Sequence, residues 1–173
     1  ESQGLASDTF VLLTSDNGPW MGGAGETCAA RSNGVFSGSK GDVLEGGIRV
    51  PAIARWPDGL PTGLRRDELV HFCDWLPTLL SVAGGTLPAG AELDGQDVLP
   101  VLRGDASTAN PVRFWQWNRY EPVPHCNAAM RDGKWKLYWP SIPEARVKSE
   151  EDAAPYHRGL KGPHWLMEID RRM

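Results

Sequence analysis

Residues 10–18 have the sequence FVLLTSDNG, and this stretch constrains the fold more than any other. A short apolar run that stops at Ser-Asp-Asn-Gly predicts a buried strand, Thr9 to Thr14, that ends in a loop. Open α/β sheets hold their ligands in the loops at the carboxyl ends of strands. Asp16 and Asn17 fall in this loop, and their side-chain oxygens are the donors that Ca²⁺ or Mg²⁺ prefers. The stretch therefore predicts a metal site.

A second loop supplies a positive charge. Residues 38–41, GSKG, place Lys40 among small residues that let an anion come close. A metal and a cation together suggest an anionic substrate. The plainer alternatives are that Ser-Asp-Asn-Gly is only a turn and that Lys40 is only an exposed lysine. The loop is not a nucleotide-binding P-loop, because Gly41 stands where Ser or Thr should bind Mg²⁺.

Composition narrows the class of protein. The 173 residues, 40% of them hydrophobic, are enough for one core or for a core with a small appendage. The 18 basic and 22 acidic residues form no basic surface run, which argues against nucleic acid as a partner. No apolar stretch is long enough to cross a bilayer. Residue 1 is not Met and no signal peptide follows it, so we expect a segment of a longer chain.

The cysteines carry little information. Cys28, Cys73 and Cys126 are widely spaced and form no zinc pattern. At most one disulfide can form, and small buried or partly exposed thiols are the simplest interpretation. They do not indicate a compartment.

Residues 1–110 are expected to form an α/β unit. A second strand is predicted at 48–56, where Pro51 indicates either an edge position or a bulge near the start of the strand. A helix follows, capped by Asp74 and ended by the glycines at 84–85. We expect its apolar face to be core, namely Leu76, Leu79, Leu80 and Ala83. A short apolar segment at 98–102 ends at Gly104.

Residues 111–173 are expected to form a small antiparallel β subdomain. Its first predicted strand is the aromatic stretch 113–118. The next two, 128–131 and 134–139, flank an Asp-Gly hairpin turn. Residues 164–169 are predicted to close the sheet. The sequence thus predicts two units of the α/β class.

The order and spacing of these segments resemble the sulfatase family, arylsulfatase-like enzymes of the alkaline phosphatase superfamily. The resemblance runs from about Leu5 to Asp170 through the segments SDNG, GSKGDVLEGGIRVPAIARWPDGLPTG, DWLPTLLSVAGGTLP, LDGQDVLPVL and MRDGKWKLYWP. The block at 40–57 is the most specific. The resemblance implies the carboxyl-terminal part of an alkaline-phosphatase-like mixed sheet with flanking helices, followed by the antiparallel subdomain.

The resemblance also implies roles for three residues. Asp16 and Asn17 match the Asp and Asn of the family that bind the active-site calcium, with Mg²⁺ the less favoured ion. Lys40 matches the family lysine that contacts the substrate sulfate, a substrate-binding and catalytic role. The motif residues Glu45, Gly46, Gly47 and Arg49 are expected to brace the loop.

The nucleophile of the family is missing from these residues. Sulfatases use a formylglycine made from the Cys or Ser of a C-x-P/A-x-R motif, and none of the three cysteines here lies in one. In the family this motif, the remaining calcium ligands and the catalytic histidines lie upstream. We therefore expect the 173 residues alone to be inactive. The four histidines, at 71, 125, 157 and 164, are expected to be structural or exposed, although His125 could line a substrate pocket with Trp115, Trp117 and Tyr120.

Three hypotheses follow. The first is a calcium-dependent sulfuric ester hydrolase; the second is a phosphate or phosphonate ester hydrolase of the same superfamily; the third is a non-catalytic sulfatase-like module. The family implies a secreted, periplasmic or lysosomal protein. The sequence does not distinguish sugar, steroid and aryl sulfates, and it does not give the oligomeric state.

Overall fold

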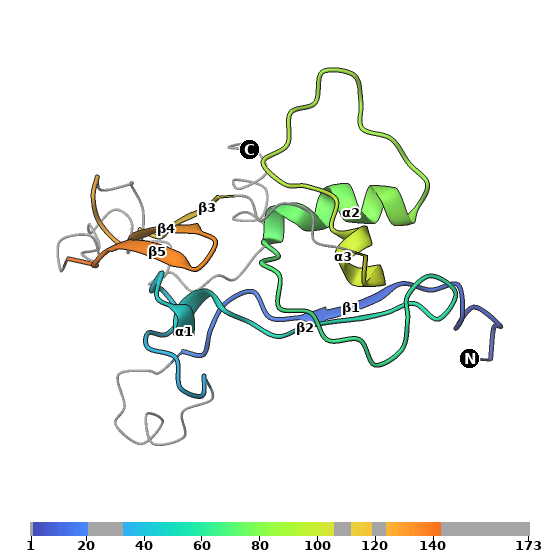
Figure 1. Cartoon of the computed structure of the whole chain (residues 1–173), viewed down its shortest axis with the longest axis horizontal. Coiled ribbons are helices and arrows are strands. Elements are labelled where there is room, and N and C mark those ends of the chain that lie inside the picture. Colours follow the sequence, from blue (N-terminus) through green and yellow to red (C-terminus); the bar gives the residue numbers. More distant parts are fainter. Residues whose placement is uncertain (1, 21–32, 106–111, 119–123, 143–173) are drawn as a thin grey trace, which may run out of the picture.

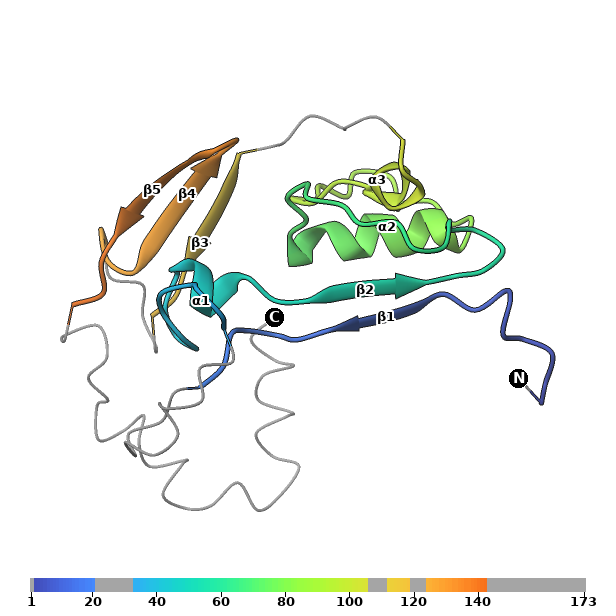
Figure 2. The same cartoon turned by 60° about the horizontal axis from the view of Figure 1, so that its bottom comes forward.

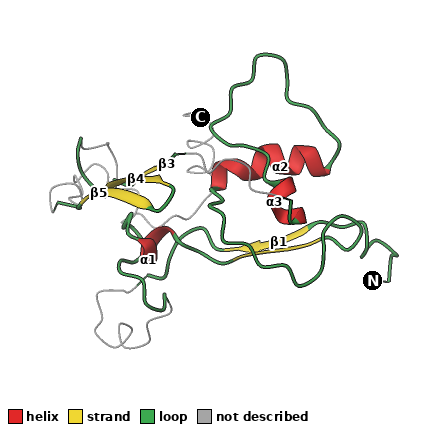
Figure 3. Cartoon of the chain, viewed as in Figure 1, coloured by secondary structure: helices red, strands yellow, loops and turns green. Residues whose placement is uncertain are grey.

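The computed structural model describes residues 2–20, 33–105, 112–118 and 124–142. Two small antiparallel sheets and two short helices make up most of its regular structure (Figure 1). Helices α2 and α3 lie over one face of the β1–β2 pair, and the β3–β5 sheet lies beside them, next to α1 (Figure 2). Loops make up much of the rest (Figure 3). The mixture of helices and strands agrees with the predicted α/β class.

Strand β1 (Val11–Thr14) pairs antiparallel with β2 (Ala52–Arg55), with Leu13 opposite Ile53. The strand predicted at 9–14 is confirmed, but the prediction that it is buried is wrong for the described residues. Leu13 is 63% exposed, because successive side chains point to opposite faces and the helices cover only one of them.

The second strand is shorter than predicted. Ile48 belongs to a one-turn helix, α1 (Glu45–Ile48), and β2 begins only after Pro51. Proline has no N–H to give to a β-ladder, so pairing starts beyond it.

Helix α2 (Trp75–Val82) follows a 3₁₀ turn at Phe72–Asp74 and ends just before Gly84, whose φ of 66° is left-handed. The predicted helix is confirmed, but its predicted apolar core face is wrong. Leu76 is 54% exposed and Leu79 43%. The buried side chain of the helix is Thr78, whose hydroxyl accepts a hydrogen bond from the N–H of Val98, just before α3.

Asp74 does not cap α2 with its side chain. Its carboxylate instead accepts a hydrogen bond from the backbone N–H of His71, 2.7 Å away, and so closes the 3₁₀ turn. Asp74 does occupy the N-cap position of α2, as predicted, but the predicted side-chain cap of that helix is wrong.

Helix α3 (Leu99–Arg103) ends at Gly104, with φ 90°, as predicted. It contributes much of the small core. The buried apolar residues are Val43, Val98, Leu99, Val101, Cys126 and Ala129.

The second sheet has the strand order β3 (Arg113–Gln116), β4 (Ala128–Asp132), β5 (Trp135–Trp139). Asp132 pairs with Trp135 across a turn in which Gly133 has φ 54°, so the predicted hairpin is confirmed. The strand predicted at 164–169 and the boundary proposed at 110/111 lie outside the described residues.

Two further predictions concern the whole chain. Cys73 and Cys126 are free thiols, and Cys28 lies outside the described residues. In the part of the chain that the structure describes, no helix has the length and hydropathy needed to cross a membrane.

Candidate functional site

Glycines bring the two predicted site loops into backbone contact. Gly18 N–H, at the end of the Ser-Asp-Asn-Gly turn, donates to Gly47 O at 2.8 Å. A Cβ on Gly18 would lie 1.8 Å from Gly46 O. Because any side chain would fill this space, only glycine allows the approach. The turn after β1 and the Glu-Gly-Gly segment of α1 therefore form one unit.

The loop that carries Lys40 closes around the same glycines. Gly46 N–H donates to Ser37 O at 2.7 Å, and a Cβ on Gly46 would lie 2.4 Å from Gly38 O. Lys40 N–H donates to Pro19 O at 2.9 Å, directly after the Ser-Asp-Asn-Gly turn. The structure thus brings together the backbones of the segments that carry the predicted metal ligands and the predicted substrate lysine.

The three predicted side chains are accessible. Asp16 and Lys40 are exposed, and Asn17 is partly buried. Asn17 Nδ2 donates to Gly18 O at 3.0 Å, so Oδ1 is its acceptor atom for a cation. The Ser15 hydroxyl donates to Asn17 O at 2.9 Å and tightens the turn.

The donor chemistry fits a hard cation but makes only part of a shell. Calcium takes about 6–8 oxygen ligands, and Asp16 and Asn17 offer a carboxylate and an amide oxygen. Within the described ranges no group of three or more His, Cys, Asp or Glu side chains is placed to hold a metal ion.

Glu45 and Arg49 make the bracing contacts predicted for them. Glu45 Oε1 lies 2.8 Å from Lys136 Nζ, and its other oxygen lies 3.8 Å from Arg49 Nη1. Lys136 also donates to Val43 O at 2.7 Å, and the Arg49 guanidinium lies 4.6 Å from the centre of the Phe36 ring. Lys136 of β5 thereby ties the loop to the second sheet, a contact that sequence reasoning missed.

A buried ion pair joins the start of α2 to β3. Asp74 is fully buried and accepts hydrogen bonds from Arg113 Nη2 and, at 3.0 Å, from Gln96 N–H. Arg113 also donates to Asp94 O at 3.0 Å. This network joins the start of α2, the segment at 94–96 and β3.

His71 and Cys73 sit beside this network. His71 Nδ1 lies 3.1 Å from Cys73 Sγ. Burial lowers the pKa of His71, and burial together with the nearby Asp74 carboxylate raises the pKa of Cys73. Both shifts favour the neutral imidazole and the neutral thiol over their charged forms. The expected structural role of His71 agrees with this geometry.

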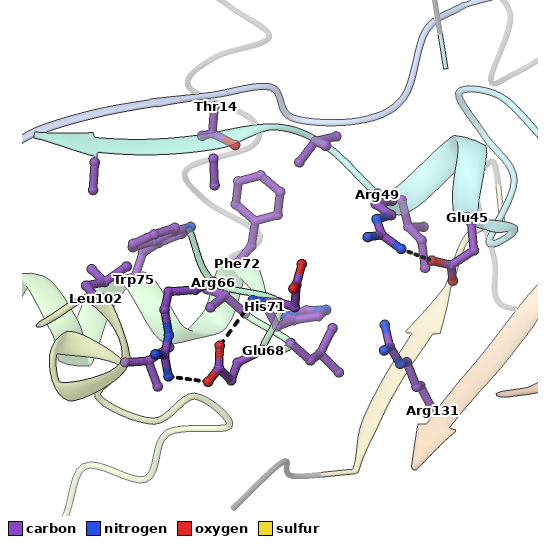
Figure 4. Close-up of a pocket in the computed structure, with 18 of the residues that line it drawn as sticks. Thr14, Glu45, Arg49, Arg66, Glu68, His71, Phe72, Trp75, Leu102 and Arg131 are labelled. Carbon is purple, nitrogen blue, oxygen red and sulfur yellow. Dashed lines mark hydrogen bonds and ion pairs between the residues drawn. The ribbon is translucent and has the colours of Figure 1, made fainter. Parts of the chain in front are cut away.

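A cavity of about 300 Å³ lies between β2, the start of α2 and the second sheet (Figure 4). Charged residues from three segments line it, among them Arg49, Arg66 and Arg131. Arg66 and Arg49 are each engaged with a glutamate. The lining does not include Asp16, Asn17 or Lys40, so the predicted site and the cavity are separate features.

The aromatic pocket predicted around His125 has its members in different contacts. The His125 ring packs edge-on against Trp139 at 4.7 Å, whereas Trp115, which lines the cavity, contacts the His71 ring at 5.3 Å. Trp117 lies against Gly41. Tyr120 is outside the described residues.

Comparisons with known proteins find sulfatases. Residues 1–85 match the Sulfatase family model. The chain is 40% identical to mouse steryl-sulfatase over 136 residues, which cover 76% of this chain and 20% of the relative. It is 36% identical to bovine arylsulfatase A over 156 residues, 88% of this chain and 28% of that protein. The chain therefore spans only a fifth to somewhat over a quarter of the length of these relatives.

The fold has solved counterparts as well. The crystal structure of Ps i-CgsB superposes with a TM-score of 0.65 at 23% identity, over 98% of this chain and 37% of that one. At this identity the likeness speaks for the fold alone. The family model and the relatives together identify this chain as a member of the sulfatase family.

Proposed function

We propose that this chain forms one wall of the active site of a calcium-dependent sulfuric ester hydrolase. In this proposal Asp16 and Asn17 are calcium ligands, and Lys40 binds the sulfate group of the substrate. The observation that carries the proposal is the pair of backbone hydrogen bonds, Gly18 to Gly47 and Lys40 to Pro19, that joins the two family motifs. Oxygen ligands and an ammonium group carried by segments whose backbones are hydrogen-bonded to one another suit a substrate with several anionic oxygens.

Each residue has a distinct task. Lys40 Nζ donates hydrogen bonds to the sulfate oxygens and offsets the negative charge that grows on them in the transition state. Asp16 and the Oδ1 atom of Asn17 hold the metal, with Ser15 and Gly18 keeping the turn in shape. Bound calcium would supply Lewis-acid polarisation of a sulfate oxygen.

The nucleophile belongs to another part of the site. We propose that a formylglycine supplies it, together with a proton donor for the leaving oxygen, from residues outside these 173. The proposed substrate is a sulfate ester, and a secreted, periplasmic or lysosomal compartment is part of the same proposal.

The test uses the chain with whatever residues its gene encodes in frame on either side. Turnover of 4-nitrophenyl sulfate and 4-nitrophenyl phosphate is measured for the wild type, Lys40→Ala and the control Lys134→Ala. Lys134 lies at the β4–β5 turn, with its ammonium 5.3 Å from the centre of the Trp135 ring. We expect sulfate turnover, a loss of about 10²–10³-fold in kcat/KM for Lys40→Ala, and no loss for the control.

Calcium is tested in the same preparation. Removing it with a chelator should abolish turnover, and added Ca²⁺ should restore it better than Mg²⁺. Asp16→Asn should raise the Ca²⁺ concentration needed for half-maximal rate. Faster turnover of the phosphate would support a phosphate ester hydrolase instead. Lack of turnover, with no C-x-P/A-x-R motif in the flanking sequence, would support a non-catalytic module.

A further inference from the structure

The buried side chain of Asn127, near the candidate site, makes hydrogen bonds through both its oxygen and its NH₂ group. It is 1% exposed and lies just before β4, in the second sheet unit. Its φ of 42° is left-handed, a conformation that asparagine tolerates better than most residues. A buried amide must find partners for both its oxygen and its NH₂ group, because an unpaired buried polar group is costly.

The partners of Asn127 lie on the loop that carries Lys40. Asn127 Oδ1 accepts from Val43 N–H at 3.2 Å, and Nδ2 donates to Gly41 O at 2.7 Å. Nδ2 also donates to Trp117 O at 2.8 Å. The side chain thus bridges the Lys40 loop and the residues that follow β3.

These contacts hold Lys40 from both sides. The backbone N–H of Lys40 donates a hydrogen bond to Pro19 O, and the carbonyl of the next residue, Gly41, accepts one from Asn127 Nδ2. The indole of Trp117 lies against Gly41, at about the distance of ordinary contact from a Cβ built there, 3.5 Å. The backbone of Lys40 is therefore fixed even though its side chain is exposed.

We propose that Asn127 is a positioning residue for Lys40, an inference that rests on the proposed sulfate-binding role of that lysine. A lysine ends in a point charge on a flexible stem, so its backbone is the part that the fold can fix. A displacement of about 1 Å in a group that orients the substrate can cost about 10²-fold in rate. Asn127 prevents such a displacement by tying the loop to the second sheet.

The principal variant is Asn127→Gly, which removes the amide and still tolerates the left-handed backbone. The matched control is Val101→Ala, which truncates a buried side chain of α3 that has no described contact with the Lys40 loop. We expect kcat/KM for 4-nitrophenyl sulfate to fall about 10–100-fold in Asn127→Gly and less than threefold in the control. In a Lys40→Ala background, Asn127→Gly should have no further effect on kcat/KM, because the two residues act through one interaction.

Hydrogen exchange tests the loop without any turnover. Amides of residues 38–47 should exchange at least tenfold faster in Asn127→Gly than in Val101→Ala, with the Val43 amide affected most. If Asn127→Gly does not fold, hydrogen exchange of the wild-type protein is measured at increasing denaturant concentration instead. The Val43 amide should then become exchangeable at the same denaturant concentration as the β4 and β5 amides. Exchange of Val43 ahead of the sheet would overturn the proposal.

The outcomes separate the two proposals. A wild type that turns over sulfate, with equal kcat/KM in Asn127→Gly and the control, refutes the positioning role alone. A full Asn127→Gly effect that persists in the Lys40→Ala background also refutes it. A wild type without turnover or calcium dependence refutes the proposed function, and with it the role of Asn127 toward substrate, while the exchange data then show only whether it holds the loop.

Discussion

At the scale of single residues, the candidate site depends on glycines, which have no side chain to keep its loops apart. Gly18, Gly46 and Gly47 let two loops approach so closely that a Cβ on any of them would lie within 2.5 Å of a backbone oxygen. The backbone bonds Gly18 to Gly47 and Gly46 to Ser37 form because of this approach. These glycines are therefore required for the close packing of the two loops.

Gly18→Ala should destabilise the fold by about 2–3 kcal/mol, because its methyl group would overlap Gly46 O and force the two loops apart. The control is Gly34→Ala, where a Cβ meets nothing within 4 Å and only the φ of 60° is unfavourable, a cost of about 1 kcal/mol. Denaturant unfolding of both variants measures the difference. Equal losses would contradict the close packing of the loops.

At the scale of secondary-structure elements, Asp74 joins three segments. Its carboxylate accepts from the His71 N–H of the 3₁₀ turn, from Gln96 N–H and from Arg113 of β3. Thr78, one helical turn later, donates its hydroxyl proton to Asp74 O at 2.6 Å and accepts from Val98 N–H at 2.9 Å. Polar contacts thus hold the start of α2 in place. The leucines of the helix bury less apolar surface than their spacing predicts.

Asp74→Ala should cost about 3–5 kcal/mol, because it leaves the Arg113 guanidinium buried without its carboxylate. Asp74→Ala combined with Arg113→Met should lose less than the sum of the two single variants, since the charge left behind is then also removed. Glu68→Gln, in the partly exposed pair with Arg66, is the comparison and should change stability little. Additive losses in the double variant would argue against a coupled pair.

At the scale of the whole molecule, one face of the β1–β2 pair is apolar and open. Val11, Leu13 and Ile53 are exposed, and Leu13 and Ile53 are cross-strand neighbours. Over the described residues the helices cover the opposite face only (Figure 2). Exposed apolar sheet surface of this kind favours association between chains.

Leu13→Thr combined with Ile53→Thr should shift the 173-residue chain toward monomer in size-exclusion chromatography with light scattering, and should lower its binding of a hydrophobic dye. A Thr–Thr cross-strand pair keeps β-propensity while it removes apolar surface. Val35→Thr, at a nearly fully exposed position outside the sheet, is the control and should change neither measurement. A wild-type chain that is monomeric and binds no dye would contradict the expectation.

The local features of this protein could be predicted from its amino-acid sequence. Glycines at 84 and 104 end helices, and Gly133 forms the β4–β5 hairpin turn together with Lys134, one residue later than the predicted Asp-Gly turn. These signals act within a few residues of the chain. The two loop motifs were likewise visible in the sequence, and with them the family. The metal and sulfate roles of Asp16, Asn17 and Lys40 stay predictions.

Which surfaces are buried, and which contacts hold the Lys40 loop, depends on how the elements pack against one another. Leu13, Leu76 and Leu79 have the pattern of core residues, yet burial depends on a partner element that the pattern does not contain. The contacts of Asn127 with Gly41 and Val43 span more than eighty positions of sequence. No local signal encodes such a pairing, because it exists only once the second sheet has packed against the loop.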